Sequence, residues 1–313
     1  MRKKLWYLVV ALLFLVVAPL VAYWYYLPAF LIEKLPSNIQ AKDATFDLNA
    51  FRADYFNIAG LSEKGCKKKN WLVAPRALVE LKNWQPSRVI IERPSIFVEP
   101  AEQPCISFAS HRQRASSIPQ TFQVELRHGA INILDVPIDF SDVQAMLKKN
   151  GKKYRGSFSA NDNFRGTVKI DGQWSGKDTP LLQVKYGWPD VSKFPARWSR
   201  PIGYVFQKGR LTLTANIAGQ GESVVSRNRL LLQNFSARQL NKKKGLGALL
   251  SPGQVDVLQI LKSKAGVIDL SFTTRWSKDA SPAQIRRLVS SALERKIRAQ
   301  VKSKLGNFMF WNR

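Results

Sequence analysis

Apolar and polar residues alternate one by one along several stretches of the sequence. In the stretch GRLTLTANIAG, Leu211, Leu213 and Ile217 fall on one side, with polar residues between them. This alternation is typical of a β-strand with one buried and one solvated face. Gly, Pro or Asn bounds the similar stretches, which are Trp71–Lys82, Ser87–Val98, Phe122–Asp135, Arg165–Gly176, Gly209–Gly219, Asn228–Leu240 and Gly266–Ser277. We therefore predict a mainly β chain built on antiparallel sheet.

Two helices are expected late in the chain. Ser251-Pro252 and Ser281-Pro282 each place Ser at an N-cap, Pro at the first helical position and Gln three residues after the Ser. The first helix is predicted to end near Lys264, and the second near Leu305, with Gly306 as its stop. An apolar stripe on the second helix should pack on the sheet; it comprises Ile285, Leu288, Val289, Ala292, Leu293, Ile297 and Val301.

A membrane anchor is expected at the N-terminus. The segment Leu5–Ile32 contains no charged residue and is long enough to cross a bilayer, with aromatic residues at both ends. Arg2, Lys3 and Lys4 precede it, so the positive-inside rule keeps the N-terminus cytoplasmic. A cleaved signal peptide is the alternative. The uncharged run is longer than a typical signal sequence, and Pro19 follows the best small-residue site.

The composition is strongly basic, with a formal net charge of +27. In the cytosol such a surface would suit a nucleic acid. Because the predicted topology exports the body of the chain, anionic lipid headgroups are the better partner, and no nucleic-acid partner is expected. A solvated basic surface without a dedicated partner is the alternative. The candidate contacts with an anionic surface lie on the predicted C-terminal helix: Arg286, Arg287, Arg295, Lys296, Arg298 and Lys302.

The two cysteines, Cys66 and Cys105, are compatible with an exported body. They could form a disulfide, or they could be two separate buried thiols. Neither belongs to a C-x-x-C pair or has a histidine nearby to complete a zinc site.

No catalytic or metal-binding motif is found. The only histidines, His111 and His128, have no second ligand at a useful spacing. The segment Gly172–Asp178 departs from a P-loop in spacing and lacks the final Ser or Thr. We therefore expect neither catalysis, a metal nor a cofactor.

The order of segments in the C-terminal half resembles the terminal module of AsmA-like proteins, particularly their DUF748-type branch in Gram-negative envelopes. GYVFQKG (203–209) leads into RLTLTAN (210–216), and NRLLLQNF (228–235) follows; an apolar helix, GVIDL (266–270) and the helix opened by Ser281-Pro282 come after. The N-terminal half, with one anchor and then VIIERPSIFV (89–98), is also similar. The family's usual G-D-L-x-D-P segment departs here to WSKDASP (276–282).

The resemblance implies an inner-membrane protein whose periplasmic part is a curved, open antiparallel sheet forming a groove. The expected divisions are an anchor at 1–32, a strand region at 33–120 and an AsmA-like module at 121–313. The implied function is the binding or transport of phospholipid in outer-membrane biogenesis, with other envelope proteins as partners. Leu211, Leu213 and Ile217 are candidate lipid contacts, unless the C-terminal helix fills that face. The alternative function is a non-catalytic scaffold or assembly subunit of a secretion-type envelope machine.

Overall fold

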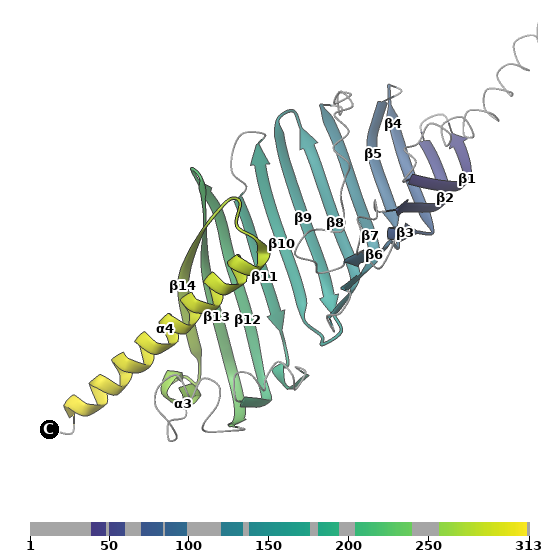
Figure 1. Ribbon diagram of the computed structural model, residues 1–313. Helices are drawn as coiled ribbons and strands as arrows, with labels where there is room; N and C mark the ends of the chain where they lie inside the picture. Colours follow the sequence, from purple (N-terminus) through teal and green to yellow (C-terminus); the bar gives the residue numbers. More distant parts are fainter. Residues whose placement is uncertain are drawn as a thin grey trace, which may run out of the picture. The chain divides into compact units, whose positions relative to one another are not determined.

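The computed structural model describes residues 39–47, 50–59, 70–83, 85–98, 120–133, 138–175, 181–193, 204–239 and 257–311. The predicted anchor, Cys66, Cys105 and His111 lie outside these residues. None of the helices that the structure describes is both long and apolar enough to cross a membrane. The chain is mainly β, as predicted, and forms two compact units, residues 1–137 and 138–313 (Figure 1).

The first unit contains a mixed sheet. Four successive strands pair antiparallel, and two of them are kinked, so that each appears as two short strands on one line. The last strand, β7, then pairs in parallel with the strand before it. The described strands are β1 (Ile39–Asp47), β2 (Ala50–Ala59), β3 (Asn70–Ala74) with β4 (Arg76–Lys82), β5 (Gln85–Glu92) with β6 (Ser95–Val98), and β7 (Thr121–Ile133).

The kinks explain why two predicted strands appear in halves. Pro75 separates β3 from β4, and Pro94 separates β5 from β6, since proline has no amide hydrogen for a sheet ladder. Opposite the second kink, Gly129 is buried, and a β-carbon there would lie 2.8 Å from Pro94 Cγ. Only glycine fits this close approach.

The predicted antiparallel pairing does not hold at β7, which pairs in parallel. Residues 99–120 separate β6 from β7, and a connection of this length can carry the chain back to the end at which the previous strand began. A parallel neighbour follows, where a tight hairpin would have given an antiparallel one.

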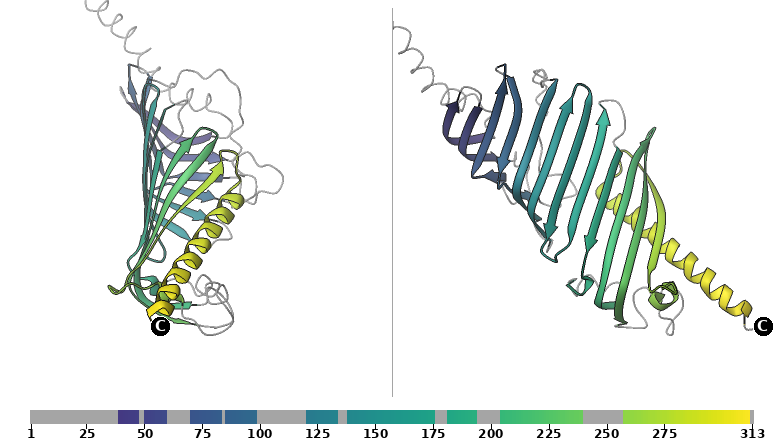
Figure 2. Two further views of the ribbon diagram at one scale, coloured as in Figure 1. Left: turned by 90° about the vertical axis from the view of Figure 1, so that its left-hand side faces the viewer. Right: turned by 180° about the vertical axis from the view of Figure 1, so that it is seen from behind.

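The second unit is a seven-stranded antiparallel meander in which each strand pairs with the next along the chain. Figure 2 shows its strands curving toward the side on which a long helix lies. The strands are β8 (Asp139–Asn150), β9 (Lys153–Asp162), β10 (Thr167–Ser175), β11 (Leu181–Trp188), β12 (Tyr204–Gln220), β13 (Ser223–Gln239) and β14 (Ile268–Ser277). A short 3₁₀ turn, η1 (Val191–Lys193), follows β11.

Two helices complete this unit, α3 (Val257–Leu261) and α4 (Pro282–Trp311). The predicted start of α4 is confirmed: Ser281 Oγ accepts from the Gln284 amide at 3.3 Å, and Gln284 Oε1 accepts from the Ser281 amide at 2.8 Å. This reciprocal pair is a capping box.

Both predicted helix ends are wrong. Helix α3 ends at Leu261 because the chain turns there, where the Ser263 amide donates to the Val267 carbonyl and Gly266 takes a φ of +76°. Helix α4 continues through Gly306, because a single glycine costs a helix only about 1 kcal/mol.

Candidate functional site

The register of the second unit divides its sheet into two faces of opposite character. Side chains of directly paired residues lie on the same face, so whole rows can be followed from strand to strand. One face, the apolar face, carries the rows Ala160–Val168–Tyr186–Leu213–Leu230–Leu270 and Phe158–Ile170–Val184–Ala215–Asn228–Phe272. The other, the polar face, carries the row Ser157–Asp171–Gln183–Asn216–Arg227–Thr273.

Part of the apolar face is the buried core of the unit. Ile297 and Val301 of α4 and Leu261 of α3 pack there with residues of β11 to β14. Lys304 of α4 links the two helices, because its ammonium group donates to the backbone carbonyls of Leu261 (2.9 Å) and Lys262 (3.1 Å) at the end of α3.

The predicted lipid contacts divide between this core and the surface beside it. Leu211 and Leu213 pack against the core cluster covered by α3 and α4. Ile217, farther along β12, stands outside this cluster and is half-buried. The helices therefore fill part of the apolar face and leave part of it without a described cover.

We call the uncovered part the apolar strip. Its side chains are apolar and half-buried, and none of them belongs to the core cluster. The strip ends at β13 and β14, because polar side chains occupy the same face there. Asn228 donates to Thr274 Oγ1 at 3.2 Å and accepts from Ser226 Oγ. The strip crosses four neighbouring strands and comprises Phe158, Ile170, Leu182, Val184, Ala215 and Ile217.

Half of the strip, Phe158, Leu182 and Val184, lies on strands that the sequence analysis did not predict. Strands β9 and β11 nevertheless carry the same period-2 signal: Leu182, Val184 and Tyr186 alternate with polar residues in LLQVKYGW. Counting alternation over shorter windows would have found them.

A buried carboxylate, that of Asp162, lies at the β9–β10 turn. Asp162 is only 5% exposed, and it accepts from the amides of Phe164 (2.8 Å) and Gly166 (2.6 Å). Tyr186 Oη and Trp188 Nε1 also donate to it. Burial, followed by this hydrogen bond and the nearby negative charge, strongly raises the pKa of Tyr186. Four donors satisfy the carboxylate, so Asp162 is a structural anchor and leaves no acceptor free for catalysis.

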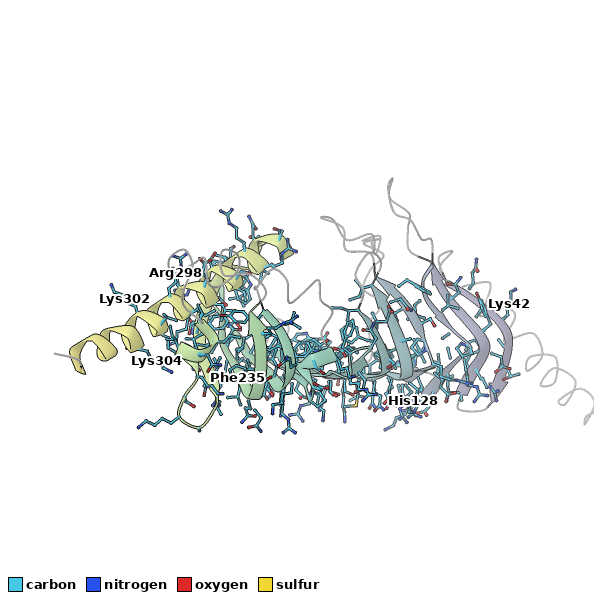
Figure 3. All side chains as sticks on the ribbon, turned by 90° about the horizontal axis from the view of Figure 1, so that it is seen from below. Lys42, His128, Phe235, Arg298, Lys302 and Lys304 are labelled. Carbon is cyan, nitrogen blue, oxygen red and sulfur yellow. The ribbon has the colours of Figure 1, made fainter. Side chains whose placement is uncertain are left out.

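The predicted basic residues of α4 are all exposed, namely Arg286, Arg287, Arg295, Lys296, Arg298 and Lys302. Arg298 pairs with Glu294 one turn earlier, at 2.6 Å. In Figure 3, Arg298 and Lys302 project away from the strands, whereas Lys304 points toward α3. The helix thus presents a cationic outer side to solvent.

In the first unit several charged residues of the sheet pair with one another. Glu125 on β7 accepts from Arg88 Nη2 and from Arg127 Nη2, each at 2.6 Å. Burial opposes ionisation of Glu125, but hydrogen bonds from Arg127 and Arg88 prevail and lower the pKa of its carboxyl below the ordinary value. This cluster is a charge-compensated ladder and does not form an open site.

No group of three or more His, Cys, Asp or Glu residues suited to a metal occurs in the described ranges. His128 lies exposed on β7 with a φ of +52°.

No protein-family model matches the chain, and a search of curated proteins gives no significant match.

Proposed function

We propose that this chain is an AsmA-like protein of the cell inner membrane that binds phospholipid, acting by binding without catalysis. In this proposal the chain has an N-terminal membrane anchor, its N-terminus is cytoplasmic, and its body is periplasmic. Its role is lipid transport in envelope biogenesis. The observation that supports it best is the apolar strip, an apolar surface on an open sheet that no described segment covers.

The chemistry of the strip suits an acyl chain. Side chains such as Phe158, Ile170 and Val184 form rows across neighbouring strands at about 4.8 Å per strand. A hydrocarbon chain laid along such rows gains about 0.8 kcal/mol for each methylene that it buries. The strip crosses four strands, from β9 to β12, so an acyl chain can lie across several of them.

The basic outer side of α4 supports the membrane part of the proposal. Each exposed Lys or Arg near an anionic bilayer contributes about 1 kcal/mol of attraction. Arg286, Arg287 and Lys296 are exposed and take part in no ion pair among the described residues. They are therefore available to lipid headgroups.

Photo-cross-linking in living cells tests the proposal. The full chain carries p-benzoylphenylalanine at Val184, on the apolar strip, or at the neighbouring Lys185, on the polar face. Cells grown with radioactive phosphate are irradiated, and the purified protein is examined for a covalently attached phospholipid. We expect label at Val184 and none at Lys185.

Equal label at both positions, or no lipid at Val184, would contradict lipid binding by the strip. A protein adduct at Val184 in place of lipid would favour the scaffold function. Aspartate at Leu211 or Leu213 is a poor test, because these side chains pack against the core under α3 and α4. Ile217→Asp is the better substitution and should abolish the label at Val184.

A further inference from the structure

The polar face of the second unit carries a hollow that the proposed lipid site does not use. Two adjoining depressions, of about 760 and 490 Å³, share Arg155, Gln173 and Leu181 in their linings. These three residues are paired across β9, β10 and β11, in a row on the polar face. We call the combined depression the polar hollow. Most of the residues that line it belong to the polar face, and Leu182 and Ile217 of the apolar strip also border it.

Positive charge is concentrated at the two ends of the hollow. Lys148, Lys153 and Arg155 line one end, and Arg227 on β13 lines the other. In the described chain none of these four side chains forms an ion pair, in contrast to Arg88 and Arg127 with Glu125 or Arg229 with Asp269. Arg155 and Arg227 are separated by four strand spacings, or about 19 Å.

The middle of the hollow is lined by amides. Gln173, Gln183, Asn216 and Gln220 each offer both donors and an acceptor. A ligand that carries only anionic groups would place acceptors against the amide oxygens, which are also acceptors. Hydroxyl groups, in contrast, can both donate to and accept from an amide. Asp171, the one carboxylate in the lining, likewise accepts from hydroxyls.

Apolar groups interrupt the amides. Leu181 is 51% exposed in the hollow, with Met146 and Ala218 nearby in the lining. Sugar rings combine hydroxyl edges with apolar C–H faces, so this alternation of amides and apolar side chains matches a glycan. An extended peptide is a poorer match, because peptides add to sheet edges through the main chain, and the main chain of these interior strands is already paired.

We propose that the polar hollow binds a negatively charged oligosaccharide. Arg155, with Lys148 and Lys153, contacts acidic groups at one end, and Arg227 contacts those at the other. The central amides hydrogen-bond to the sugar hydroxyls. The proposal does not rest on phospholipid binding by the apolar strip.

Calorimetry with the full chain in detergent tests this proposal. The probe is an octamer of galacturonic acid, and its methyl-esterified form serves as the neutral counterpart. We expect the acidic octamer to bind and the neutral form to bind at least tenfold more weakly. Arg155→Gln and Arg227→Gln should each weaken binding about tenfold, the effect of losing one charge-assisted hydrogen bond. Both side chains are exposed, so the variants should fold, which circular dichroism verifies.

Two controls separate a built site from general attraction to a basic protein. Arg286→Gln with Arg287→Gln removes more charge, from α4, and should leave the affinity unchanged. Asn216→Leu changes no charge and should weaken the acidic octamer several-fold, but should not affect a polyglutamate peptide of equal charge. Equal losses from the α4 and hollow variants, tighter binding of polyglutamate, or no binding of the octamer would each overturn the proposal. The Arg155→Gln variant should still give the lipid label at Val184 in the photo-cross-linking experiment. Loss of octamer binding with the lipid label retained therefore separates the failure of one proposal from the failure of the other.

Discussion

Asp162 shows how a single buried charge can organise the turn that contains it. Its carboxylate accepts from two amides of the β9–β10 turn and from two aromatic side chains of β11. Gly166 makes the arrangement possible, because a β-carbon there would lie 2.5 Å from Asp162 Oδ2. The aspartate and the glycine are therefore required together.

Asp162→Asn should destabilise the protein by about 3 kcal/mol. The amide keeps the shape but presents an NH₂ group to donors, which leaves buried N–H or O–H groups without an acceptor. Urea unfolding followed by tryptophan fluorescence measures the loss. Asp171→Asn, at an exposed position on β10, is the matched control and should change the stability by less than about 0.5 kcal/mol. Equal effects of the two substitutions would refute the anchoring role of Asp162.

Glu125 should make the first unit sensitive to acid. Its folded pKa lies below the ordinary value of about 4.3. Its ion pairs therefore stabilise the fold above the ordinary pKa, and this contribution is lost as the pH falls through the lower folded pKa. Acid titration of the free energy of unfolding should give a shallower decline for Glu125→Gln than for the natural protein. An unchanged slope for Glu125→Gln would contradict the assignment.

At the scale of the element, α4 depends on a few apolar contacts and on the Lys304 link to α3. The C-terminal part of the predicted stripe is buried, with Val301 fully covered and Ile297 at 5% exposure. Leu288, in the second turn of the helix, is 40% exposed. The helix therefore docks through its middle, where Ala292, Ile297 and Val301 are buried and α3 and β14 contact it.

Ile297→Ala should destabilise the second unit by about 2–4 kcal/mol, because it removes buried methyl groups and leaves a cavity. Leu288→Ala removes the same number of carbon atoms from an exposed site and should cost less than about 1 kcal/mol. Thermal unfolding of the two variants provides the comparison. If Leu288→Ala proved the more damaging, the docking of α4 would have to involve its first two turns.

The whole molecule combines a proposed anchor with two β units. The second unit uses both sides of its sheet, an apolar face partly covered by α4 and a polar face with a basic hollow. In the first unit, Arg88 and Arg127 pair with Glu125 within the sheet. The basic residues that line the polar hollow, by contrast, form no ion pair among the described residues.

The proposed topology predicts the behaviour of reporter fusions. Alkaline phosphatase fused after Arg313 should be active, because the positive-inside rule places that end in the periplasm. A fluorescent protein fused before Met1 should fluoresce in the cytoplasm and serves as the control. An inactive phosphatase on a stably produced fusion would reverse the orientation, and with it the argument against a nucleic-acid partner.

The sequence by itself determined the local structure wherever a signal lies within a few residues. Alternation predicted β7, β10 and β12 to β14, and Ser281 with Gln284 predicted the start of α4. Such features depend on neighbours in the chain, so the pattern contains them. The ends of α3 and α4 were beyond this reach, because a turn and a tolerated glycine depend on the surrounding packing.

Only the tertiary structure decided which apolar residues are core and which remain uncovered. Leu213 and Ile217 share one strand face and look alike in the sequence, yet the core of α3 and α4 meets only Leu213. The parallel pairing of β7 and the meeting of Arg155 with Gln173 and Leu181 likewise join residues distant in the sequence. Period-2 alternation gives the face of each strand but not what lies against it, because cover is a property of elements brought together from elsewhere in the chain.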